Sequence, residues 1–375
     1  MDTITQSLLG AVTAQLGFRQ RLGRGATWVA AGAALVPDLD VLAGPVLRAT
    51  GFEAGGLGHW VTHRGLSHSL LLVPILALPI AALWWWVRTR RRKRPPQEDD
   101  TGGQAASGTR HDRPAAPFST LYACVFVALA SHPLLDWCTS YGTQLLAPMS
   151  RMRFAADCVP IIDIFYTPLL ALTLVGCLIV RKVKRLDGPR ASLAVGWIGF
   201  GLSVAYLASG WVLHERAVEV ARGLAKGETV VQADAYPALG SIFLWRTVVE
   251  TTDEWQVARV RPLAADPAAT ARVNVVPDVS NRWTWLARAV PEGNAYEWFA
   301  MGRIRAAYRR VGDRHFVELH DMRYGPRPES AESLWPLHMT FEADELIPEV
   351  KRLSRRGHQD VWGVISEAWR DLWAP

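Results

Sequence analysis

The chain has 375 residues, of which 50% are hydrophobic, with a net charge of +6 and a mean hydropathy of +0.07. The average conceals a change near residue 213, because long apolar runs come before it and an ordinary soluble composition follows it. The densest basic block, residues 88–94, follows an apolar run without interleaved aromatic residues. This pattern favours a signal for membrane topology over a nucleic-acid site.

Six apolar segments occupy the first part of the chain. They lie at residues 4–18, 26–42, 66–87, 120–137, 161–180 and 193–213. A helix needs about twenty residues to cross the bilayer core, and the third, fifth and sixth segments are long enough to do so alone. The first two segments are short. We therefore predict a mainly α fold, in which residues 1–213 form a polytopic transmembrane bundle of about five or six apolar helices.

Basic residues orient these segments. Arginines at 19, 21 and 24, the block at 88–94 and the run at 181–185 lie in loops that should be cytoplasmic. Alternation then puts the amino terminus, the loops at 41–65 and 138–160, and everything after residue 213 on the opposite side. Residues 88–117 combine basic, acidic, Pro and Gly residues with almost no large apolar ones, which predicts a disordered cytoplasmic loop.

The composition of residues 214–375 predicts a separate domain. Runs at 241–251, 255–261 and 315–320 are rich in β-branched and aromatic residues and are separated by Pro, Gly and Asp. We expect a smaller α+β, β-rich domain on the extracytoplasmic side.

Four polar elements interrupt the ends of the apolar segments. Ionisable groups near hydrocarbon are costly and usually mark function. The predicted topology puts all four elements at the extracytoplasmic ends of their helices. Together they supply seven candidate metal ligands, namely Asp38, Asp40, His63, His68, His132, Asp136 and Asp163.

The residue types indicate a divalent metal. His132 and Asp136 are four residues apart, so they share one face of a helix. Imidazole and carboxylate ligands suit Zn²⁺, Mn²⁺ or Fe²⁺, with zinc favoured, and the four Cys lack the spacing of a thiolate site. Simpler interpretations stay open. Asp136 could be a local helix cap, and Arg64 could contact a substrate phosphate or carboxylate, or extend to the interface.

At these residues the chain resembles the YdjM-like, LexA-regulated family of inner-membrane-bound metal-dependent hydrolases. The resemblance rests on MDTITQ at residues 1–6, PDLD at 37–40, HRGLSHS at 63–69, HPLLD at 132–136 with the following CTSYGTQ, and Asp163. It covers roughly the first 210 residues. It implies a multi-pass protein of the bacterial inner membrane in which the seven residues bind metal. Gln6 departs from the pattern, because many members carry His there.

The predicted function follows from both lines of reasoning. A metal-activated water would attack an ester or phosphoester, with a lipid-linked substrate suiting the outer face of the inner membrane. The expected partners are membrane lipids and this substrate, and no nucleic acid. The alternative is a non-enzymatic protein, either a metal-stabilised scaffold or a metal or ion transporter. Ligands at helix ends disfavour transport, which needs a site near the bilayer midplane.

Overall fold

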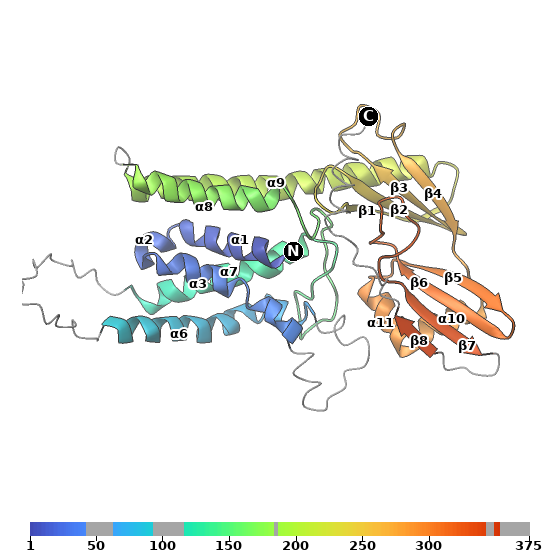
Figure 1. Ribbon diagram of the computed structural model, residues 1–375, viewed down its shortest axis with the longest axis horizontal. Coiled ribbons are helices and arrows are strands. Elements are labelled where there is room, and N and C mark those ends of the chain that lie inside the picture. Colours follow the sequence, from blue (N-terminus) through green and yellow to red (C-terminus); the bar gives the residue numbers. More distant parts are fainter. Residues whose placement is uncertain (43–62, 93–115, 184–186, 343–348, 353–375) are drawn as a thin grey trace, which may run out of the picture.

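The computed structural model describes residues 1–42, 63–92, 116–183, 187–342 and 349–352. The molecule is elongated, with helices at one end and strands at the other (Figure 1). Most of the predicted cytoplasmic loop, residues 93–115, lies outside the described residues. Residues 88–92 belong to the end of a helix.

Helices make up the first part of the chain. They are α1 (Thr3–Gln15), α2 (Phe18–Leu22), α3 (Gly25–Ala33), α6 (Val73–Arg92), α7 (Phe118–Trp137), α8 (Tyr166–Lys182) and α9 (Gly188–Leu224), with the 3-10 helices η1 (Pro37–Leu42) and η2 (Leu66–His68) between them.

Within the described residues, α7 and α9 are the helices long and apolar enough to cross a membrane. The expected five or six spanning helices are thus not confirmed. The third and fifth predicted segments do not form helices of the required length and hydropathy, for different reasons. Helix α6 begins only at Val73, and Trp84–86 and its basic end lower its hydropathy, while α8 has 17 residues.

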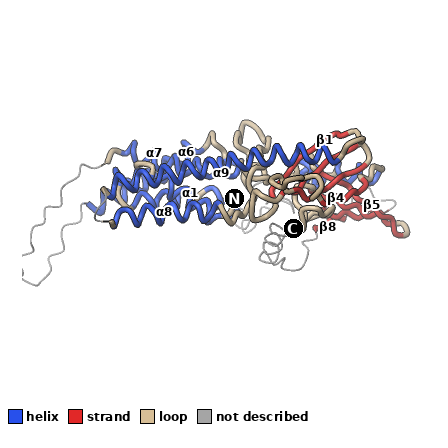
Figure 2. Tube along the Cα trace, turned by 90° about the horizontal axis from the view of Figure 1, so that it is seen from above, coloured by secondary structure: helices blue, strands red, loops and turns tan. Residues whose placement is uncertain are grey.

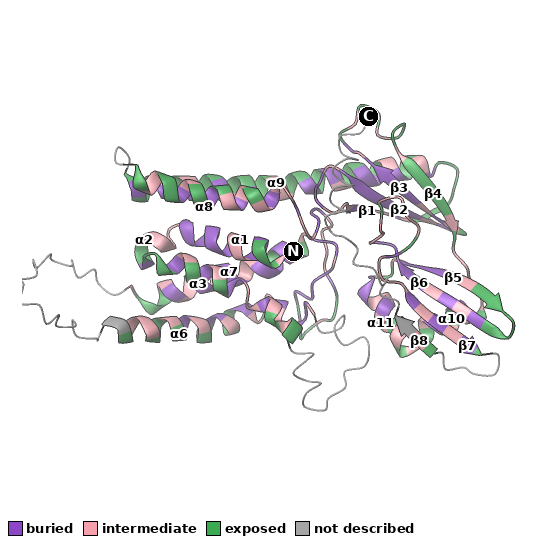
Figure 3. Ribbon diagram, viewed as in Figure 1, coloured by how far each residue is buried: buried purple, intermediate pink, exposed green. Residues whose placement is uncertain are grey.

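Small residues let the helices approach one another closely. A Cβ atom added to Gly10 of α1 would lie 2.5 Å from Cβ of Ala34, which follows α3. One added to Gly199 of α9 would lie 2.1 Å from Oγ1 of Thr173 in α8. The outer surfaces are different, since much of α8 and α9 is exposed (Figure 3). Large apolar side chains such as Leu172 and Val212 are among the exposed ones. This combination of close small-residue contacts and an apolar exterior is typical of helices packed in lipid.

The second part contains two antiparallel sheets, which confirms the predicted β-rich region. The first sheet has the order β1 (Val230–Pro237), β2 (Trp245–Thr251), β3 (Glu254–Val260) and β4 (Arg272–Pro277). The second has β5 (Ile304–Val311), β6 (Arg314–Asp321), β7 (Leu337–Glu342) and β8 (Glu349–Arg352), and the helices α10 (Arg282–Ala289) and α11 (Pro291–Phe299) connect the two sheets.

Helix α9 joins the two parts of the molecule. It runs past residue 213 to Leu224, so the predicted domain boundary falls inside a helix (Figure 2). Ala217 and Ala221 of this helix share a core with Trp245 and Val249 of β2. The long helix therefore holds the β-rich region beside the end of the bundle at which the candidate ligands lie.

Candidate metal centre

Four predicted ligands meet at the end of the helical bundle that faces the sheets. His132 and Asp136 occupy the last turns of α7, His68 ends η2, and Asp38 lies in η1. One donor atom from each lies within 4.8 Å of the others, an arrangement that could hold a metal ion. The two Nε2 atoms of His68 and His132 are 3.0 Å apart. Oδ1 of Asp38 lies 3.3 Å from Nε2 of His132, and Oδ2 of Asp136 lies 3.3 Å from Nε2 of His68.

Hydrogen bonds on the far side of each imidazole determine which nitrogen faces the cluster. Nδ1 of His132 donates to the main-chain oxygen of Ala34. Nδ1 of His68 lies 2.9 Å from Oγ of Ser67, and that hydroxyl already donates to Asp40, so Nδ1 of His68 carries the hydrogen. In the neutral rings, two Nε2 lone pairs therefore face each other, an arrangement that a cation between them would stabilise.

The carboxylates fit the same interpretation. Oδ2 of Asp136 is buried and faces both imidazoles, since it also lies 3.5 Å from Nε2 of His132. Two imidazole nitrogens and two carboxylate oxygens are ligands that Zn²⁺ accepts at a tetrahedral site. The residues present thus fit a divalent metal.

The electrostatics of the cluster favour a positive charge. Burial by itself would raise the pKa of Asp38, but hydrogen bonds with His132 and His68 outweigh it and hold that pKa well below its usual range. Burial opposes protonation of His68, but hydrogen bonds with Asp136, Asp38 and Asp40 raise its pKa to about 10. A proton or a divalent cation can supply the charge that this cluster attracts, so metal binding there would release a proton.

Asp40 and His63, two further predicted ligands, lie beside the cluster rather than in it. Oδ1 of Asp40 is 2.8 Å from Nδ1 of His63. Its Oδ2 accepts hydrogen bonds from the main-chain N–H of Arg64 at 3.1 Å and from the hydroxyl of Ser67 at 2.8 Å. Asp40 therefore organises the turn that presents His68.

Asp163 lies outside the cluster, in the turn that precedes α8. Its Oδ1 accepts hydrogen bonds from the N–H groups of Phe165 and Tyr166, both at 2.8 Å, and its Oδ2 accepts one from the hydroxyl of Tyr206 at 2.8 Å. Asp163 therefore orders the turn that leads into α8 by accepting hydrogen bonds from backbone N–H groups that lack a partner within the helix.

Arg64 and Gln6 both contact Asp136. The Arg64 guanidinium is buried, lies 3.1 Å from Oδ1 of Asp136 and donates to Oγ1 of Thr139 at 2.8 Å. It points into the protein rather than towards the interface. The Gln6 side chain donates to Oδ1 of Asp136 at 3.0 Å and to the main-chain oxygen of His132. The α-amino group of Met1 donates to the same Asp136 oxygen. Gln6 thus orients Asp136 through its amide nitrogen, while its Oε1 is buried and has no hydrogen-bond partner among the described residues.

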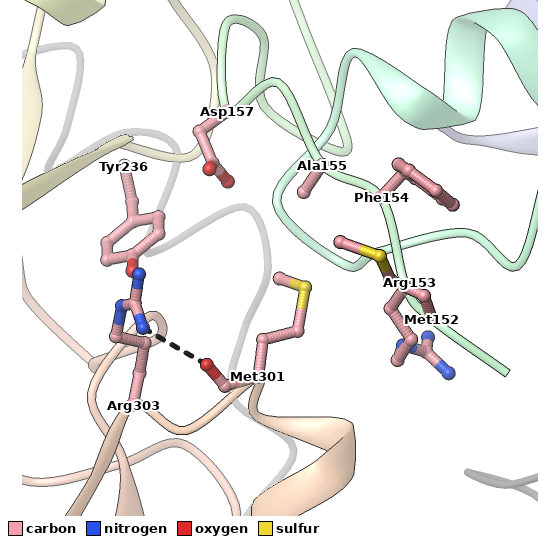
Figure 4. A pocket seen from close by; sticks show the side chains of 8 residues that line it. All are labelled: Met152, Arg153, Phe154, Ala155, Asp157, Tyr236, Met301 and Arg303. Atoms are coloured by element: carbon pink, nitrogen blue, oxygen red, sulfur yellow. Dashed lines mark hydrogen bonds between the residues drawn. The ribbon is translucent and has the colours of Figure 1, made fainter.

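A separate cavity of roughly 210 Å³ lies where residues 152–157 meet the β-rich region (Figure 4). Arg153, Asp157, Tyr236, Met301 and Arg303 are among the residues that line it. Burial raises the pKa of Asp157 to about 6. The four cluster residues do not line this cavity, so it is distinct from the metal centre.

Comparisons with known proteins identify the family. No curated protein and no solved structure matches the chain. The model of the YdjM inner membrane protein family matches residues 1–217, which include all four residues of the cluster. This match covers more than half of the chain. The chain therefore belongs to the YdjM inner membrane protein family.

Proposed function

We propose that this protein is a membrane-bound, metal-dependent hydrolase that cleaves an ester or phosphoester. The observation that carries the proposal is the pair of imidazole Nε2 atoms 3.0 Å apart, with both opposite nitrogens already hydrogen-bonded and two carboxylates alongside. Fixed neutral imidazoles with carboxylates are the ligands of hydrolytic zinc sites.

A bound divalent metal would lower the pKa of a water molecule, which could then attack the substrate. His68 and His132 provide neutral donors, while Asp38 and Asp136 provide negative charge. The Arg64 guanidinium, 3.1 Å from Asp136, offsets part of that charge in a buried setting. The chain thus supplies the donors, their orientation and a compensating cation.

Exposure suggests how a substrate reaches the cluster. The Asp38 side chain is 20% exposed, whereas those of His68, His132 and Asp136 are at most 1% exposed. Leu39 of η1 and Leu66 of η2, the two short helices that carry Asp38 and His68, are more than half exposed. Large aliphatic side chains exposed beside a site are what a lipid phase would cover. We therefore propose a lipid-linked substrate at the outer face of the inner membrane, with membrane lipids as the immediate partners.

The first test measures bound metal. Wild-type protein purified in detergent should contain zinc or another divalent metal, and His132→Ala should lose it. His338→Ala is a matched control, because His338 is a partly buried imidazole of β7 that lies outside the cluster. Unchanged metal content in His132→Ala would refute the assignment. The metal-loaded wild type should then hydrolyse a lipid phosphate, a water-soluble phosphodiester or a carboxylic ester, and His132→Ala should not.

A metal-stabilised scaffold is the second candidate. It is favoured by one observation, the nearly complete burial of three of the four donors, since structural sites are closed. A scaffold would bind metal and lose thermal stability when a chelator removes it, yet show no turnover on any of these substrates. A transporter fits less well, because the cluster lies at the end of α7 rather than near its middle.

A further inference from the structure

Tyr141 lies between the metal centre and the β-rich region. It belongs to the loop after α7, five residues beyond Asp136. Its ring packs against the hydrophobic core beneath the second sheet, which includes Phe299, Val317 and Leu337. On its other side it faces residues that surround the cluster. A single side chain therefore contacts both parts of the molecule.

On the side of the second sheet, Tyr141 is held through its ring and its main chain. The buried Phe299 ring and the Tyr141 ring form an edge-to-face pair with a centroid distance of 5.1 Å. The guanidinium of Arg323 donates to the main-chain oxygens of Ser140 at 2.9 Å and Tyr141 at 3.3 Å. Arg323 is itself fixed by a two-pronged, fully buried ion pair with Asp321. These contacts leave the ring little freedom.

On the side of the metal centre, the same ring supports Arg64. Cζ of Arg64 lies 4.6 Å from the Tyr141 centroid, which is a cation–π contact. The two terminal nitrogens of Arg64 bind Asp136 and Thr139, whereas its Nε has no hydrogen-bond partner among the described residues. The aromatic face thus provides the contact that orients the guanidinium plane. The backbone of Arg64 is also unusual, with φ at 59°.

We infer that Tyr141 is a positioning residue through which the β-rich region, acting through Phe299 and Arg323, holds Arg64 and hence Asp136 at the metal cluster. This inference rests on the proposed metal centre. It gives the β-rich region a role, which is to hold Arg64 in place through Tyr141. Groups that orient metal ligands typically change metal affinity by about 10- to 100-fold when removed. The ring, rather than the phenol hydroxyl, carries this role.

The test compares Zn²⁺ affinity by chelator competition in full-length protein, together with the visible spectrum of the Co²⁺-substituted form. Tyr141→Leu, which keeps an apolar side chain without a ring, should weaken Zn²⁺ binding by about 10- to 100-fold and alter the Co²⁺ bands. Tyr141→Phe should behave as wild type. Phe299→Leu should weaken binding in the same direction but less. Val317→Ala is the control, because it damages the same buried core but removes none of the ring and guanidinium contacts that hold Tyr141.

Each outcome has one meaning. Wild-type affinity and spectrum in Tyr141→Leu would overturn the inference. An equal loss in Val317→Ala and Phe299→Leu would also overturn it, because the effect would then come from general destabilisation of the core. A wild type that binds no metal refutes the metal centre itself. Metal binding without hydrolysis refutes the proposed activity but leaves the inference intact, since its readout is affinity.

Discussion

Nδ1 of His132 donates a hydrogen bond to the main-chain oxygen of Ala34 at 2.6 Å. The bond joins the end of α7 to the residue that follows α3. It decides which imidazole nitrogen faces the cluster, and it makes the metal centre depend on how α3 packs against α1.

We expect Gly10→Ala to weaken metal binding at a distance. The added Cβ would lie 2.5 Å from Cβ of Ala34 and 2.6 Å from the main-chain oxygen of Ala30, so α3 must move and carry the His132 acceptor with it. Overpacking of this kind costs about 1–3 kcal/mol of stability, and Zn²⁺ affinity should fall by roughly tenfold. Chelator competition and thermal unfolding measure the two effects. Gly32→Ala in α3 is the control, because its Cβ would meet no atom within 4 Å.

Asp40→Asn separates an orienting carboxylate from a ligand. Asp40 holds Ser67 and His63, and it approaches Nδ1 of His68 to 3.4 Å, but it lies outside the cluster. The variant should bind Zn²⁺ about 10- to 100-fold more weakly, yet reach the wild-type stoichiometry at saturating metal. Titration followed by metal analysis measures both quantities. A lower stoichiometry at saturation would instead make Asp40 a direct ligand, as the sequence predicts.

Asp163→Ala should reduce stability without reducing metal content. The carboxylate accepts hydrogen bonds from two N–H groups at the start of α8 and from Tyr206, and loss of such hydrogen bonds costs about 1 kcal/mol or more. Thermal unfolding in detergent should show the loss, while metal analysis should match the wild type. Loss of metal from a folded Asp163→Ala protein would restore Asp163 to the ligand set.

Asp157→Asn should stabilise the protein above neutral pH. Because burial raises the pKa of Asp157 to about 6 in the folded protein, the folded state binds the proton more tightly than the unfolded state does. Ionisation therefore lowers the stability of the wild type as the pH rises from about 4 to about 6, and the loss persists above that range. The variant should gain about 2 kcal/mol over the wild type at pH 8 relative to pH 4. Unfolding curves at both pH values measure this gain, and a pH-independent difference would contradict it.

Local patterns in the sequence predict the larger features of the molecule. Hydropathy separates an apolar helical part from a β-rich part, because burial in lipid and burial in a sheet need different residue patterns. The spacing of His132 and Asp136 predicts that they share a helical face, which is a local geometric consequence of the helix. The motifs around them indicate the YdjM family, which the family model confirms.

Only the tertiary structure decided which of the seven candidates meet. Asp38, His68, His132 and Asp136 come from three separated elements, and their convergence depends on how η1 and η2 pack onto α7. Sequence spacing cannot show which candidates meet, so Asp40, His63 and Asp163 are predicted together with the four residues of the cluster. The role of Tyr141 was equally hidden, because its contacts with Arg64 and Phe299 join residues far apart in the chain. Residue types thus determined the chemistry that is possible, and long-range packing determined which atoms come close enough to perform it.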